Sequence, residues 1–107
     1  MAIREAVFQS SVIKEVEKMF PGCVVLKNDA NYLPGIPDLL ILYKNTWAML
    51  EVKKGIYAAR QPNQEHYVEK LDEMSFASFI CPENKQEVLN ELQRAFKIRR
   101  PTRLSQR

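Results

Sequence analysis

The fold is decided by residues 38–53, DLLILYKNTWAMLEVK, which read as two short apolar strands separated by a polar pair. We interpret Lys44-Asn45 as a two-residue hairpin turn, since asparagine tolerates the positive φ that such turns need. A turn of this length pairs the strands so that the numbers of facing residues sum to 89. In this register Asp38 faces Glu51, with Cβ atoms about 5 Å apart.

One side of this hairpin ends in three charges. Lys53 lies two residues beyond Glu51 and therefore shares its side of the strand. The other residues of that side are apolar, which predicts a buried sheet face; they are Leu40, Leu42, Trp47 and Met49. Facing carboxylates destabilise a strand pair, and a divalent cation such as Mg²⁺ removes the conflict. The alternative is that Asp38 caps a loop while Glu51 and Lys53 form a solvated strand end.

Upstream of the hairpin, residues 5–20 have helical periodicity, and Pro21-Gly22 ends that helix. The expected inward stripe consists of Gln9, Val12, Val16, Met19 and Phe20. Residues 23–27 read as a short strand, and residues 28–37, with their asparagine, aspartate and proline content, read as a loop. The chain is therefore expected to enter the hairpin through a helix and a strand.

Downstream, a loop over 55–61 is expected to lead into a helix over 62–74, with proline at its first turn. The apolar stripe of this helix is Tyr67, Val68, Leu71 and Met74. A strand over 76–80 and a third helix from Pro82 follow, and the stripe of that helix is Val88, Leu89, Leu92 and Phe96. The order α-β-β-β-α-β-α predicts one α/β domain, with helices packed on a mixed sheet of about four strands.

Two polar residues fall on otherwise apolar helix stripes. Glu5 lies at the start of the inward stripe of the first helix, where a metal ion or Lys53 would be a partner for its charge. Gln64 shares the apolar face of the second helix and is able to orient a carboxylate, Lys53 or a phosphate. His66 points away from that face and is expected to be a surface residue.

The composition excludes several classes of protein. The chain has 107 residues, 46% hydrophobic and 27% charged, which is typical of one globular domain and not of a disordered chain. No apolar run approaches the roughly 18 residues of a membrane span, and the N-terminus lacks a signal-peptide pattern. The two cysteines predict reduced thiols in a cytoplasmic compartment.

The net charge of +3 is unevenly distributed. Residues 97–107 contain five basic residues and no acid, which leaves 11 basic against 13 acidic residues in 1–96. We therefore divide the chain into a domain over 1–96 and a basic tail over 97–107. Such a tail suits a polyanion such as nucleic acid, and the alternative is a solubilising terminus.

Four sequence elements together resemble a known family. Pro37-Asp38 followed by Glu51-Val52-Lys53 is similar to the PD-(D/E)XK motif of metal-dependent nucleases, whose core has a similar element order. The narrower resemblance is to the VRR-NUC branch, common in bacteriophages, and its four elements are Glu5 with Gln9, Gly35-Ile36-Pro37-Asp38, Glu51-Val52-Lys53-Lys54 and Gln61-Pro62-Asn63-Gln64. The resemblance covers about residues 4–96 and implies a restriction-endonuclease-like fold.

The resemblance implies a role for each matching residue. Asp38, Glu51 and the backbone carbonyl of Val52 would bind Mg²⁺ or Mn²⁺, and Glu5 would help to hold the metal directly or through water. Lys53 would be the catalytic lysine. Gln64 resembles a glutamine that follows the motif in several branches.

Basic residues near these positions are expected to contact DNA. Lys54 and Arg60 flank the motif and would position the phosphate backbone. The alternative is that both side chains are only solvated. Lys97, Arg99 and Arg100 follow the third helix without a groove-reading pattern, which favours sequence-independent phosphate contacts.

The sequence is therefore interpreted as a metal-dependent DNA endonuclease, acting on branched, flap or nicked DNA. By analogy with junction resolvases it is expected to form a homodimer or a higher homo-oligomer and, if encoded by a phage, to work in the bacterial cytoplasm. A sequence-specific homing-type endonuclease is the alternative within the enzyme class. A non-catalytic nucleic-acid-binding module on the same fold, or a domain that uses these charges only for packing, are the alternatives outside it.

Overall fold

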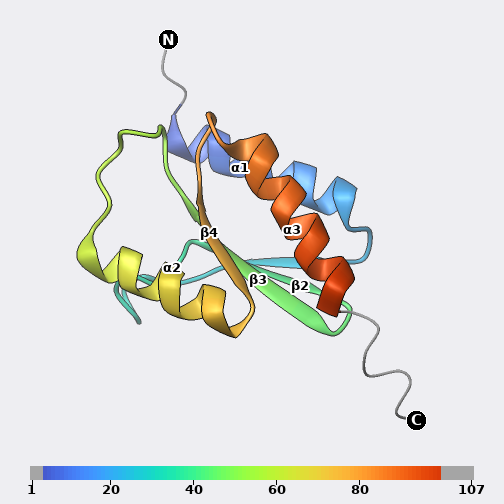
Figure 1. Cartoon of the computed structure of the whole chain (residues 1–107). Coiled ribbons are helices and arrows are strands. Elements are labelled where there is room, and N and C mark those ends of the chain that lie inside the picture. The colour runs from blue at the N-terminus through green and yellow to red at the C-terminus, as the bar shows by residue number, and fades with distance from the viewer. Residues whose placement is uncertain (1–3, 100–107) are drawn as a thin grey trace.

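The computed structural model describes residues 4–99, and its elements follow the predicted order α-β-β-β-α-β-α (Figure 1). The elements are α1 (Glu5–Met19), β1 (Val24–Lys27), β2 (Leu39–Tyr43), β3 (Thr46–Val52), α2 (Pro62–Met74), β4 (Phe76–Ile80) and α3 (Lys85–Arg99). The third helix begins three residues later than expected, after a turn in which the Asn84 amide donates to the Cys81 carbonyl and the Asn84 side chain accepts from the Cys81 amide. Helix α3 also continues to Arg99, so residues 97–99 of the predicted tail are helical, whereas 100–107 lie outside the described residues.

The four strands form one mixed sheet in the order β1-β2-β3-β4. Strands β1, β2 and β3 are antiparallel neighbours, and α2 carries the chain across so that β4 pairs parallel with β3. The pairs Leu39–Leu50 and Tyr43–Thr46 confirm the predicted hairpin register. The turn is also where it was expected, but the residue at positive φ is Lys44, at 56°, and not asparagine.

Two helices cover one face of the sheet and one helix covers part of the other (Figure 1). Helices α1 and α3 pack on the first face and form with it the main core, which contains Leu39, Ile41, Ala48, Leu50, Val52 and Ile80 from the strands. Helix α2 lies across β3 and β4 on the second face. The sheet is thus deeply buried on one side only.

The second face corrects the expectation that the side carrying Asp38 and Glu51 is a buried sheet face. Its apolar residues on the hairpin are only half-buried, and Leu42 is exposed. Val24 and Leu26 on β1 are also exposed. Because α2 does not extend over β1 and β2, this half of the face lacks a helix to cover it in the part of the chain that the structure describes.

Helix α1 confirms Val12, Val16 and Phe20 as inward residues and adds Phe8, which the predicted stripe omitted. Glu5 was expected on the inward stripe, but it is exposed, as are all residues from Arg4 to Val7. The first turn of α1 therefore extends beyond the core. The stripes of the other two helices are confirmed except for Met74, which is exposed at the last residue of α2.

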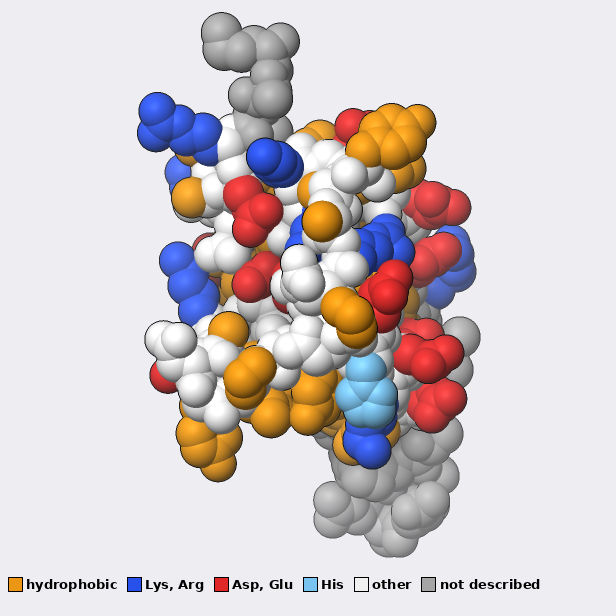
Figure 2. Space-filling view, turned by 90° about the vertical axis from the view of Figure 1, so that its left-hand side faces the viewer, with side chains coloured by type: hydrophobic (Ala, Val, Ile, Leu, Met, Phe, Trp, Pro, Cys, Tyr) orange, Lys and Arg blue, Asp and Glu red, His pale blue; other side chains and the backbone are white. Residues whose placement is uncertain are grey.

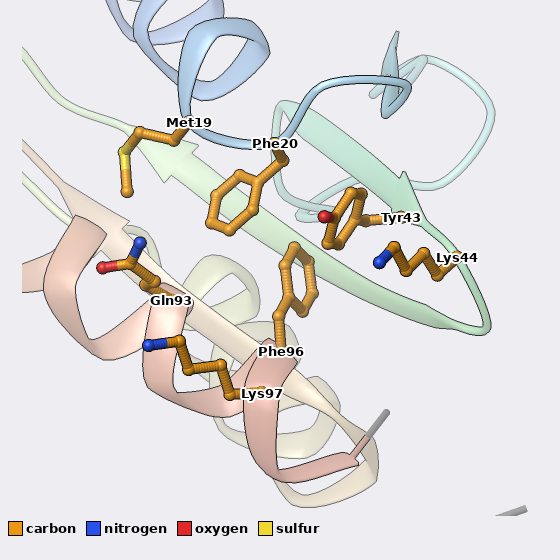
Figure 3. Close-up of a pocket in the computed structure, with 7 residues that line it drawn as sticks. All are labelled: Met19, Phe20, Tyr43, Lys44, Gln93, Phe96 and Lys97. Atoms are coloured by element: carbon orange, nitrogen blue, oxygen red, sulfur yellow. The ribbon is translucent and has the colours of Figure 1, made fainter. Parts of the chain in front are cut away.

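At the turn end of the hairpin, three aromatic rings close the core. Phe20, Tyr43 and Phe96 pack with ring centroids 5.0–5.5 Å apart and border a hollow of about 230 Å³ (Figure 3). Lys44 and Lys97 line the same hollow. This hollow lies at the opposite end of β2 from Asp38. Among residues 4–99, no helix has the length and hydropathy that crossing a membrane requires.

Candidate active site

The hairpin register brings Asp38 and Glu51 together, as predicted. Asp38 directly precedes β2, and its Oδ2 accepts a hydrogen bond of 2.8 Å from the Val52 amide of β3. Asn28 fixes the backbone of Pro37 and Asp38. Its amide N–H donates to the Asp38 carbonyl at 2.9 Å, and its side chain donates to the Pro37 carbonyl at 2.8 Å. The Val52 amide therefore holds the carboxylate of Asp38, and Asn28 holds the backbone on which it is carried.

Lys53 continues β3 on the side of Glu51, also as predicted. Its backbone N–H donates to the Ile80 carbonyl, which extends the pairing with β4 by one residue. Its Nζ lies 3.9 Å from Glu51 Oε2, and the side chain is only 12% exposed. The ammonium is thus held at the end of the strand pair, beside the carboxylates.

Gln64 connects these two side chains from helix α2. Its Nε2 donates to Glu51 Oε2 at 3.0 Å, and its Oε1 accepts from Lys53 Nζ at 2.8 Å. The same Oε1 accepts from the Gln61 amide at 3.0 Å, as half of a capping box that begins the helix. The start of α2 and the orientation of the charged pair therefore depend on one amide group.

One oxygen of Glu51 has no protein partner. Its Oε1 is buried, and no hydrogen bond reaches it from any residue in the described range 4–99. The side chain as a whole is only 5% exposed. A buried carboxylate oxygen without a partner is costly, and a bound cation is one of the few groups that repays the cost.

The environment favours the protonated form of Glu51 when no cation is bound. Burial and the nearby charge of Asp38 raise its pKa from 4.5 to about 7, with a smaller contribution from Glu5. Lys53 and the Asp38 backbone amide act in the opposite direction but do not offset this. Burial also raises the pKa of Asp38, against the lowering effects of the Val52 amide and Lys53.

Two loops border the site. Residues 28–38 lead from β1 to Asp38, and residues 53–61 lead from Lys53 to α2. Gly35, at φ 94°, packs so closely on the first turn of α2 that a Cβ there would lie 2.8 Å from the Asn63 carbonyl oxygen. The loop before Asp38 thus contacts the helix that carries Gln64. Figure 2 shows acidic and basic side chains in the middle of this side of the molecule, with hydrophobic side chains gathered below them.

The remaining predicted site residues are outside the hydrogen-bonded group of Glu51, Lys53 and Gln64. Glu5 is exposed, and within residues 4–99 no three acidic, histidine or cysteine side chains converge as a metal-binding group. Its assignment as a metal ligand stays a prediction, although its charge contributes to the pKa of Glu51. Lys54 is exposed, as is His66 on α2. Lys97 is exposed on α3, at the distant hollow.

Arg60 has a contact that the sequence did not indicate. Its guanidinium lies 4.0 Å from the centroid of the Phe79 ring, a cation–π arrangement. Phe79 is paired with Glu51 across β3 and β4, so this ring belongs to the face that carries the site. Arg60 is therefore held beside the site and is not a freely solvated cation.

The donor set fits a hard divalent cation. Carboxylate oxygens, a backbone carbonyl and water are the ligands that Mg²⁺ prefers, and one or two carboxylates commonly suffice because the ion keeps several waters. Asp38, the unpaired Oε1 of Glu51 and the Val52 carbonyl are the groups that would supply them.

Comparisons of the chain with models of protein families, with characterised proteins and with solved structures gave no significant match. The assignment of a function therefore depends on the residues and geometry of the site.

Proposed function

We propose that this protein is a metal-dependent nuclease that hydrolyses phosphodiester bonds in DNA, of the kind that the PD-(D/E)XK resemblance implies. One observation carries the proposal: Glu51 has a buried oxygen that no hydrogen bond reaches within residues 4–99, and the hairpin register, continued by one pair, puts Asp38 opposite this residue. This arrangement is unfavourable in a purely structural domain, because burial raises the pKa of both carboxyl groups and the charge of Asp38 raises that of Glu51 further.

The chain's own residues have separate tasks in this reaction. Asp38, Glu51 and the Val52 carbonyl would hold Mg²⁺ or Mn²⁺, which when bound supplies a Lewis acid and an activated water. Lys53 places a positive charge next to this position, where it stabilises the negative charge that develops on the phosphate. Gln64 orients both Lys53 and Glu51 through its two hydrogen bonds.

The basic residues would bind the polyanion. Lys54 is exposed directly after the motif, and Arg60 is held beside it. Both are suited to contacts with phosphates that flank the cleaved bond. The products that the resemblance implies carry 5′-phosphate and 3′-hydroxyl ends.

The proposed setting is the cytoplasm, where the free thiols of Cys23 and Cys81 would stay reduced. A homodimer is proposed from the resemblance, and sedimentation equilibrium of the purified protein tests it. A monomer at all concentrations would contradict the dimer without affecting the nuclease assignment.

The experiment is cleavage of end-labelled four-way junction, flap, nicked and linear duplex DNA with Mg²⁺, with Mn²⁺ and with EDTA. Glu51→Gln and Asp38→Asn preserve the shape of the side chains and remove their charge. Glu69→Gln removes an exposed charge from α2 and is the matched control. Metal-dependent cleavage that is lost in the first two variants and kept in the control supports the proposal, and equal cleavage by all the variants contradicts it.

A further inference from the structure

Two of the ten aromatic side chains are almost completely exposed, and both lie on the loops that border the candidate site. Tyr32 is 88% exposed and Tyr57 is 98% exposed. The other eight aromatic residues are buried or half-buried. Tyr32 lies six residues before Asp38, and Tyr57 lies four residues after Lys53.

Hydrogen-bonded turns hold both rings outward. The Tyr32 amide donates to the Asp29 carbonyl at 3.1 Å, and the Asp29 side chain accepts from the Asn31 amide at 2.9 Å. In the second loop, the Ala58 amide donates to the Gly55 carbonyl at 3.1 Å and closes a turn around Tyr57. Each exposed ring is therefore part of a defined turn.

The two loops lie on the same side of the molecule. Figure 1 shows both of them at the left-hand side, beside the start of α2. The approach of Gly35 to Asn63 joins the first loop to that helix start, and the second loop runs directly into it. Both loops that carry the tyrosines thus reach the start of α2, where Gln64 accepts a hydrogen bond from Lys53.

We propose that Tyr32 and Tyr57 stack on nucleobases, and that the substrate therefore has unpaired bases next to the phosphate that is cleaved. This inference depends on the proposed nuclease function and narrows its substrate to single-stranded or flap DNA. An exposed ring gains from a flat apolar partner, and every base offers one. Bases inside an intact duplex are already stacked on each other, so they are not accessible to a side chain without unstacking. Lys54 and Arg60, on the same loop as Tyr57, would contact the adjoining phosphates.

The test measures binding, so that it does not require cleavage. Fluorescence anisotropy in EDTA compares single-stranded, flap and fully paired DNA on the wild type and on Tyr32→Ala, Tyr57→Ala, Tyr32→Phe and Tyr57→Phe. The alanine variants should bind single-stranded and flap DNA roughly 5- to 150-fold more weakly, the range for loss of one stacked base. The phenylalanine variants should bind as the wild type does, because they keep the ring.

Met74→Ala is the matched control, since Met74 is another exposed apolar side chain but lies at the far end of α2. It should bind all DNA forms as the wild type does. Steady-state cleavage by the alanine variants should show a raised KM for flap DNA with little change in kcat.

Unchanged binding of single-stranded DNA by both alanine variants would overturn the inference. An equal loss for duplex and single-stranded DNA would overturn it too, because it would indicate a general contact and not base stacking. Either result is compatible with the nuclease function, provided that the wild type cleaves DNA and the Glu51→Gln variant does not. Conversely, base stacking without any metal-dependent cleavage would reject the nuclease function alone.

Discussion

The side-chain nitrogen of Gln64 donates a hydrogen bond of 3.0 Å to Glu51 Oε2, whereas Oε1, also buried, has no hydrogen-bond partner among residues 4–99. The other end of the same amide accepts from Lys53 at 2.8 Å. An amide is suited to this position because it donates to an anion and accepts from a cation at once. Gln64 of helix α2 therefore orients both Glu51, on β3, and Lys53, just after this strand.

Replacing Gln64 with leucine should destabilise the protein. The variant leaves Glu51 Oε2 and the Lys53 ammonium without their bonds and removes half of the capping box, at a cost of about 1–3 kcal/mol. Urea denaturation measures this free energy of unfolding. Gln86→Leu is the control, because Gln86 is exposed and its side chain donates to Asn90 on the same helix. A Gln64→Leu variant as stable as this control would contradict the bridging role.

The stability of the metal-free protein should fall as the pH rises towards neutrality. Glu51 has a pKa of about 7 in the folded protein and 4.5 as its ordinary value, so between these values the folded state keeps a proton that the unfolded chain has lost. Because the folded state binds more protons in this window, raising the pH favours unfolding. Above pH 7, the free energy of unfolding is lower by about 3 kcal/mol than at acidic pH. The raised pKa of Asp38 acts in the same direction.

The Glu51→Gln variant isolates this effect, since glutamine resembles the protonated carboxyl. In EDTA, its free energy of unfolding should be close to that of the wild type at pH 5. At pH 8 the variant should be the more stable by up to about 3 kcal/mol. A difference that does not change with pH would show that Glu51 does not titrate as its burial indicates.

Gly35 should be more sensitive to alanine than another glycine with nearly the same backbone conformation. Gly35 and Gly22 have φ values of 94° and 90°, so both variants carry the strain of a left-handed residue, of about 1 kcal/mol. A Cβ at Gly22 would meet nothing within 4 Å, whereas one at Gly35 would press on the Asn63 backbone at 2.8 Å. Thermal unfolding should therefore show a clearly larger loss for Gly35→Ala. Equal losses would mean that the loop and α2 separate without cost.

Lys53→Met should slow the chemical step more than it weakens DNA binding, because its charge acts mainly in the transition state. Lys54→Met should do much less to the chemical step, since Lys54 is exposed and outside the hydrogen-bonded cluster of Lys53, Gln64 and Glu51. Single-turnover cleavage at saturating DNA separates the two steps. If Lys54 were the essential lysine, the assignment of the motif would be off by one residue.

Deleting residues 100–107 removes three arginines and leaves α3 intact. If these residues bind phosphates, DNA affinity should fall and its salt dependence should flatten, by about 0.9 in the slope of log K against log salt for each phosphate that is no longer neutralised. Replacing the same three arginines with glutamine keeps the length and is the control for chain truncation. An unchanged slope in both variants would identify the segment as a solubilising terminus.

The sequence predicted the hairpin and its register because a two-residue turn leaves little freedom in how the strands pair. The facing of Asp38 and Glu51 followed from that register alone. The predicted burial of the two faces was less accurate, since both faces of the hairpin are apolar. Tertiary packing decides which of the two faces the helices α1 and α3 cover. When both faces are apolar, the alternation of side chains along the strands does not indicate this choice.

Glu5 illustrates a second limit. Helical periodicity gives the angle of a residue around the helix axis but not whether the core extends beneath it, and the first turn of α1 projects past the core. The bridge made by Gln64 was accessible from the sequence as a polar residue on an apolar stripe. The capping box of Gln61 and Gln64 carried no comparable signal, because glutamine is not one of the residues that usually begin this motif. The stacking of Arg60 on Phe79 depends on a loop path that no local pattern specifies.

The most direct test of the central claim is the rate of flap-DNA cleavage with Mn²⁺ by the wild type and by Glu51→Gln, at the same saturating DNA concentration. If Glu51 and Asp38 together hold a catalytic cation, the loss of either ligand slows hydrolysis by about 100-fold or more. We predict that the wild type cleaves and that Glu51→Gln, folded and still binding DNA, does so at least about 100-fold more slowly. Cleavage by Glu51→Gln at the wild-type rate would contradict the account.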